Sequence, residues 1–65
     1  MTKEQLKEVK VGDVLLCVFG DWHFSKDEVY TVRQHGSGLP VVWCDDIQPH
    51  WVHTLDPTMF RMMNK

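Results

Sequence analysis

The sequence predicts a mainly β fold, a small five-stranded barrel that forms a single domain over residues 1–65. Three observations lead to this fold class. Short runs of β-branched and aromatic residues recur along the chain, as strands require. Turn residues separate these runs at close intervals, which is typical of small barrels. Three Trp, three Phe and one Tyr offer large apolar surfaces from which so short a chain can build a core.

Residues 1–10 are expected to form a helical extension, and residues 11–63 the barrel itself. Thr2 and Gln5 have the spacing of a capping box, in which a hydroxyl and an amide satisfy two backbone N–H groups at the start of a helix. Leu6 and Val9 follow at helical spacing. A helix or frayed turn over residues 3–9 is too short to persist alone, so we expect it to fold against one end of the barrel.

Each expected strand is bounded by residues that interrupt β-structure. Gly20-Asp21 ends the first strand, and Asp45-Asp46 ends the third. Pro49 cannot donate to a ladder, so the fourth strand is expected to begin at about His50. Residues 55–58 suit a single 3₁₀ turn before the last strand. The five expected strands span residues 14–19, 28–33, 41–44, 50–53 and 59–63.

The order of a long first loop, two hairpins, a helical turn and a closing strand is the SH3-like plan. The runs VGDVLLCV and FSKDEVYTV, the acidic DD turn, the WV pair and the late Phe60 resemble small SH3-like proteins that bacteriophages often encode. This resemblance covers roughly residues 10–61. It implies an SH3-like barrel and a protein that binds and redirects a host protein. The aromatic residues that form the polyproline groove of signalling SH3 domains are missing, so proline-peptide binding is not expected.

The charge balance disfavours nucleic acid as the partner. The chain has nine acidic and seven Lys or Arg residues, and nucleic-acid binding depends on a basic patch that displaces counterions from phosphates. The alternative function is a nucleic-acid-binding barrel in which basic residues and Trp22 form one strip. The residues of that strip would be Lys10, Lys26, Arg33 and Arg61.

The compartment is expected to be the cytoplasm. The N-terminus has no apolar stretch of the kind that secretory signals contain, and no segment approaches the length of a membrane span. We therefore expect a complete small cytoplasmic protein that does not bind membranes. In a reducing compartment Cys17 and Cys44 are expected to be free thiols.

Histidine and cysteine residues raise the question of a metal site, and the spacing argues against one. His50 and His53 form a His-x-x-His pair, but residues three apart on a strand point to opposite faces. The chain also lacks a Cys-x-x-Cys knuckle. We therefore predict no metal ion and no cofactor. The residues weighed for this site are Cys17, His23, Cys44, His50 and His53.

Enzyme activity is not expected either. Cys44, His50 and Asp46 could serve as nucleophile, base and orienting acid, but no cation or helix N-terminus is indicated that would lower the pKa of the Cys44 thiol. A barrel this small is also expected to lack a pocket of the usual volume, about 300–1,000 Å³. No catalytic residue is assigned.

The stretch from Phe19 to Val32 suggests a protein-binding surface. Trp22 follows the break after the first strand, and Trp is enriched among the residues that dominate interface energy. The alternative is that Trp22 folds back and caps the mouth of the barrel. The function expected is a non-enzymatic protein-binding module, in which two acidic residues steer a basic partner. The predicted partner-binding residues are Trp22, His23, Phe24, Trp51 and Met63, with Asp45 and Asp46 as the steering pair.

Two further expectations concern the sheet. Trp43 and Trp51 lie in adjacent expected strands and could oppose each other across the ladder, where aromatic pairs stabilise a sheet, with one in the core and the other added to the Trp22 surface. A five-stranded barrel also keeps open edges that can accept another strand. A homodimer built on such an edge is a further possibility for a core this small.

Overall fold

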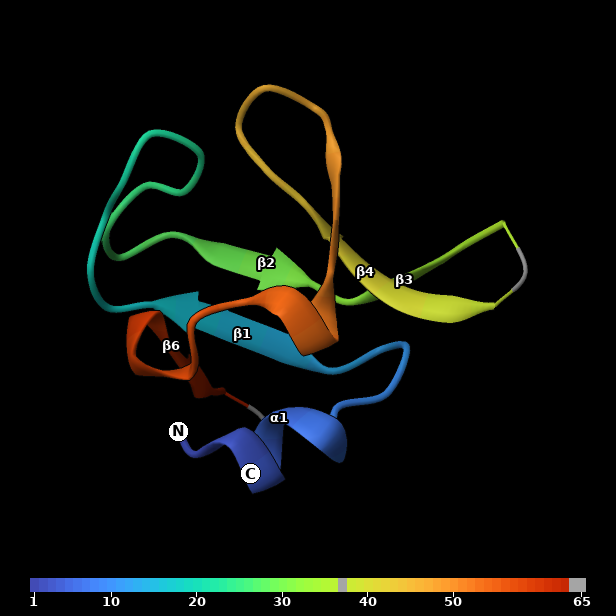
Figure 1. Ribbon diagram of the computed structural model, residues 1–65. Coiled ribbons are helices and arrows are strands. Elements are labelled where there is room, and N and C mark those ends of the chain that lie inside the picture. Colours follow the sequence, from blue (N-terminus) through green and yellow to red (C-terminus); the bar gives the residue numbers. More distant parts are fainter. Residues whose placement is uncertain (37, 64–65) are drawn as a thin grey trace.

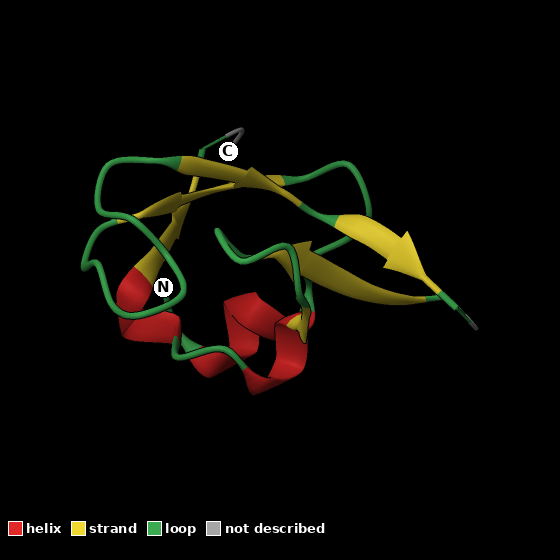
Figure 2. Cartoon of the chain, turned by 90° about the horizontal axis from the view of Figure 1, so that it is seen from above, coloured by secondary structure: helices red, strands yellow, loops and turns green. Residues whose placement is uncertain are grey.

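The computed structural model describes residues 1–36 and 38–63, and it contains six short strands in two antiparallel sheets. One sheet has the strand order β2-β1-β6 and the other β3-β4-β5 (Figure 1). The helical segments gather on one side of the strands when the molecule is seen from above (Figure 2). The elements are α1 (Lys3–Lys7), β1 (Val14–Cys17), β2 (Val29–Thr31), β3 (Arg33–His35), β4 (Leu39–Trp43), β5 (Pro49–Trp51), the 3₁₀ helices η1 (Val52–Thr54) and η2 (Pro57–Met59), and β6 (Phe60–Met62).

The predicted five-stranded SH3-like barrel is wrong, because the strand expected over residues 28–33 is divided at Val32. The N–H of Val32 donates to Asp13 O at 2.8 Å, and its carbonyl accepts from Gly12 N at 2.9 Å. These bonds tie Val32 to the turn before β1 and redirect the chain. The part before Val32 pairs with β1, and the part after it pairs with β4. Among the described residues no ladder joins the two sheets, so no barrel closes.

The fourth expected strand is also shorter than predicted. It ends at Trp51, because Val52 begins η1, in which Leu55 N donates to Val52 O at 3.1 Å. Pro49 opens β5 instead of preceding it. This is compatible with its missing N–H, since β5 is an edge strand of its sheet. The expected single 3₁₀ turn corresponds to η2, and η1 was not predicted.

The N-terminal helix was predicted correctly in its cap and incorrectly in its length. Thr2 and Gln5 form both bonds of the capping box, but α1 ends at Lys7. Leu6 and Val9 are both buried, so the segment expected to be an extension belongs to the main core. None of the helices within residues 1–36 and 38–63 has the length and apolar character needed to cross a bilayer.

The core lies between the two sheets and the helical segments. Its aromatic centre is Phe24, whose ring contacts Tyr30 and Phe60 edge to face at 5.0 and 5.1 Å between centroids. Both cysteines are buried and free, as the sequence predicts. The buried residues of this cluster are Leu6, Val9, Leu15, Cys17, Phe24, Tyr30, Val32, Val42, Cys44, Val52, Leu55 and Phe60.

Replacing Phe60 tests this core. Phe60 is 1% exposed, so Phe60→Ala should lower the free energy of unfolding by about 3–5 kcal/mol, a large share of the stability of so small a domain. Phe19 is 62% exposed, so Phe19→Ala should change it by no more than about 0.5 kcal/mol. Urea denaturation of both variants measures the difference. Equal effects would contradict the core assignment.

Candidate functional site

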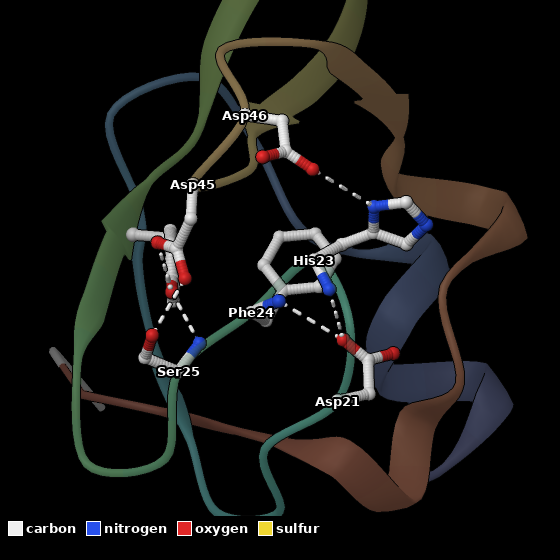
Figure 3. A network of polar contacts seen from close by, with 7 residues as sticks. Asp21, His23, Phe24, Ser25, Asp45 and Asp46 are labelled. Atoms are coloured by element: carbon white, nitrogen blue, oxygen red, sulfur yellow. Dashed lines mark hydrogen bonds and ion pairs between the residues drawn. The ribbon is translucent and has the colours of Figure 1, made fainter.

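The loop between β1 and β2 (residues 18–28) and the loop between β4 and β5 (residues 44–48) lie side by side at one end of the molecule (Figure 1). We call them the loop pair. Asp45 joins them. Its N–H donates to His23 O at 2.8 Å, and its carboxylate accepts from Ser25 Oγ at 2.6 Å and from Tyr30 Oη at 2.9 Å (Figure 3). The two loops are therefore held against each other by backbone and side-chain bonds.

The tip of the first loop is ordered by its own contacts. The Asp21 carboxylate accepts from the N–H groups of His23 and Phe24 at 2.8 and 2.9 Å, and Asp21 N donates to Phe24 O at 2.8 Å (Figure 3). Gly20 lies where the loop folds back on itself, and a Cβ there would make a tight contact, 3.0 Å from the backbone N of Lys26. Trp22 lies between Asp21 and His23, whose backbone is held by these bonds, so its indole is carried by a fixed backbone.

In the second loop, two backbone hydrogen bonds enclose the three central residues, and the last of these, Ile47, has an unusual conformation. Ile47 N donates to Cys44 O at 2.9 Å, and Cys44 N donates to Gln48 O at 3.0 Å. Ile47 has φ 58°, the left-handed conformation for which glycine is usual in such loops. This conformation costs a residue with a Cβ about 1–2 kcal/mol. The Ile47 side chain is 78% exposed, so burial within the chain offsets little of that cost.

Large apolar side chains of the loop pair face solvent. Trp22 is 92% exposed and Phe19 is 62% exposed, in addition to Ile47. The sequence left open whether Trp22 faces solvent or folds back to cap the core. The indole faces solvent and does not cap the core. An exposed Trp and an exposed Ile on two connected loops are the kind of residues that bind another protein.

One of the predicted partner-binding residues belongs to the core, and another also stabilises the loop pair. Phe24 is 3% exposed and cannot contact a partner, so its assignment to the surface is wrong. The carboxylate of Asp45 accepts from Ser25 and Tyr30, so Asp45 also stabilises the loop pair; the residue is exposed, and its steering role stays a prediction. The side chain of Asp46 is 65% exposed and remains available for steering.

The contacts given for Trp51 and Met63 are with residues outside the loop that carries Trp22. Trp51 pairs with Val41 and not with Trp43, so the predicted Trp–Trp cross-strand pair is wrong. The His35 ring instead contacts both indoles, at 5.5 and 6.0 Å between centroids. Met63 N bonds to Val14 O, which places Met63 beside the start of β1, whereas the Trp22 loop follows the end of β1.

The basic residues of the alternative function are distributed over the molecule. Lys10 precedes β1 and Lys26 lies in the loop after it, at the two ends of that strand. Arg61 lies beside Leu16 in one sheet, and Arg33 begins β3 in the other. This arrangement does not favour one continuous basic strip.

The structure brings together three of the five residues that were weighed for a metal site and set aside because of their spacing in the sequence. One ligand atom each from His23, Cys44 and His50 lies within 4.8 Å of the other two. His53, the other member of the His-x-x-His pair, is exposed in η1. No sequence spacing marks this set, because its members come from the first loop, the end of β4 and β5.

A hollow of about 410 Å³ lies between α1 and β6, away from the loop pair. The expectation that the chain is too small for a hollow of this volume is therefore wrong. Its lining offers a carboxylate and a guanidinium but no nucleophilic side chain. The lining residues are Met1, Gln5, Glu8, Arg61 and Met62.

Comparison of the chain with known protein families, with curated proteins and with solved structures found no match in any of the three. The site is therefore interpreted from its own geometry.

Tyr30 supports the loop pair, and its loss should be measurable. Its hydroxyl accepts from Ser25 N at 2.7 Å and donates to Asp45. Tyr30→Phe leaves both groups without this partner and should lower the free energy of unfolding by about 1–3 kcal/mol in urea denaturation. A loss below about 0.5 kcal/mol, the range of an ordinary surface change, would show that the hydroxyl bonds do not hold the loops.

The pH dependence of stability gives a second readout of the same residue. Burial, and to a smaller extent the Asp45 carboxylate, raise the pKa of Tyr30 above its ordinary value. The unfolded chain therefore loses the Tyr30 proton first as pH rises, and the stability that this group contributes below about pH 10 is lost above it. Tyr30→Phe should flatten the alkaline fall in stability. An unchanged alkaline slope would contradict the assignment.

Proposed function

We propose that the protein is a non-enzymatic protein-binding module whose contact surface is the loop pair. Trp22 and Ile47 serve as its apolar anchors, and His23 is a polar contact at the rim. The observation that carries the proposal is the 92% exposure of Trp22 on a loop whose backbone is held on both sides of the indole. Because the sequence resembles small phage proteins that bind host proteins, the partner that we propose is a host protein.

The energetics of the loop pair support a binding role. A fixed backbone means that little loop entropy is lost when a partner is bound, so more of the contact energy appears as affinity. Trp22 can bury a large apolar area at a small cost in side-chain freedom. Ile47 maintains a strained backbone while its side chain faces solvent, and such strain without internal benefit is typical of functional positions.

The charges around the anchors indicate the chemistry of the partner. Asp46 is exposed beside His23, and Asp21 lies next to Trp22 in the chain. Acidic groups at the rim of an apolar contact favour a partner with Lys or Arg around an apolar pocket, and they increase the association rate at low salt.

A pull-down with matched variants tests the proposal. Tagged protein is exposed to bacterial lysate with and without nuclease, and retained proteins are identified by mass spectrometry. Trp22→Ala should lose a specific protein partner and keep the native circular dichroism spectrum. Leu39→Ala should keep the partner, because Leu39 is a half-exposed apolar residue on the β3–β4 hairpin, outside the loop pair.

Two results would contradict the proposal. Retention that disappears with nuclease and falls steeply with salt would indicate nucleic acid as the ligand. Equal retention by wild type and Trp22→Ala would show that the indole is not an anchor.

Ile47 provides a test in which stability and binding change in opposite directions. Ile47→Gly relieves the left-handed strain and should raise the free energy of unfolding by about 1 kcal/mol in urea denaturation. The same variant removes an anchor and should weaken retention of the partner. A variant that is more stable and binds equally well would show that Ile47 is not part of the contact surface.

A further inference from the structure

Three side chains beneath the exposed tip of the loop pair converge from separate segments. His23 comes from the first loop, Cys44 follows β4, and His50 lies in β5. A ligand atom from each lies within 4.8 Å of the other two, and the His23 and His50 rings are 5.0 Å apart between centroids. We propose that the protein binds a zinc ion through His23, Cys44 and His50, and that the ion fixes the loop pair.

Two of these side chains carry a buried nitrogen atom that makes no hydrogen bond within the described chain. Nδ1 of His23 and Nε2 of His50 are buried and have no hydrogen-bond partner within the described chain. The carboxylate oxygen nearest to His23 Nδ1 belongs to Asp46 and is 3.8 Å away, too far for a hydrogen bond. Buried polar atoms without partners are uncommon and costly, and a metal ion would satisfy both nitrogens.

The donor set selects the class of metal. Two imidazole nitrogens and a thiolate suit zinc, whereas calcium and magnesium require oxygen ligands. In a tetrahedral site with Zn–N of about 2.0–2.1 Å and Zn–S of about 2.3 Å, the ligand atoms are about 3.3–3.6 Å apart. The cluster must therefore contract, by about 1.5 Å at most. His23 can supply the movement, because its side chain is 44% exposed and lies on a loop.

The fourth coordination position is open to Asp46 or to water. Asp46 Oδ2 lies 3.8 Å from His23 Nδ1, close to the separation of two ligand atoms around one zinc ion (Figure 3). The proposal depends only on the three ligands His23, Cys44 and His50.

A zinc ion at this position would have a structural effect. It would bind the first loop, which carries Trp22, to the end of β4 and to β5. Domains of this size often need a metal or a disulfide to supplement a small core, and the two cysteines of this chain are free. The zinc site stands independently of the partner proposed above, because it is measured on the protein alone.

Cobalt(II) titration of the reduced protein tests the donor set. One equivalent should produce the thiolate-to-metal charge-transfer absorption and the visible bands of tetrahedral cobalt, and zinc should remove both by competition. Cys44→Ser should abolish the charge-transfer absorption, while Cys17→Ser, which changes the other buried cysteine, should keep it. His50→Ala should weaken binding at least tenfold, and His53→Ala should not.

Thermal unfolding gives a second measurement. Zinc at about 100 times its Kd should raise the Tm of the wild type by about 10–20 °C. His23→Ala should lose this shift, and because His23 lies on a loop this variant stays informative if Cys44→Ser fails to fold. An unchanged Tm of the wild type, cobalt binding without thiolate absorption, or equal loss in the Cys17 and Cys44 variants would overturn the proposal.

Discussion

The arrangement of the two sheets depends on the packing of the Phe24 ring between them. No ladder among the described residues joins the sheets, so side-chain packing and side-chain hydrogen bonds such as that from Tyr30 to Asp45 must hold them together. Phe24 lies 5.0 Å from Tyr30 in β2 and 5.2 Å from His50 in β5, measured between ring centroids. It therefore contacts a strand of each sheet at once. Edge-to-face aromatic pairs contribute about 0.5–1.5 kcal/mol each beyond their buried area, which is substantial in a core this small.

Because Phe24 comes from a loop, that loop is part of the core and also part of the surface. The chain inserts Phe24 between the sheets and presents Trp22 to solvent two residues earlier. Asp21 and Asp45 determine the path between these two positions through bonds to the backbone. The orientation of the exposed indole is thus a consequence of how the sheets are packed together.

Much of the secondary structure follows from local sequence, whereas the joining of the strands does not. The capping box at Thr2, the β-branched runs and the closing strand at Phe60 are local features, and the structure contains all three. The closed barrel was wrong because the bend at Val32 arises from bonds to Gly12 and Asp13, which no alternation pattern reveals. A continuous β-branched run does not show that its two halves pair with different strands.

The sequence predicted one residue of the candidate site, Trp22, but it did not predict which residues the fold brings together. The Gly20-Asp21 break and the position of Trp22 after it were visible in the sequence, and the indole is exposed. Phe24 was misassigned because an aromatic residue in a loop has the same local signature whether it faces solvent or a core. The meeting of His23, Cys44 and His50 depends on how the loops fold over β5, and residue spacing carries no information about it.

The division into two sheets also has a consequence for the order of folding. The strands of β3-β4-β5 follow one another along the chain, so short hairpin connections suffice to assemble them. The sheet β2-β1-β6 must instead recruit its last strand from the far end of the sequence, by pairing Cys17 with Phe60. Closing a long loop costs more entropy than closing a hairpin, and contacts between distant residues form slowly. We expect the hairpin sheet to form early, and the recruitment of β6 to limit the rate at which the native core is completed.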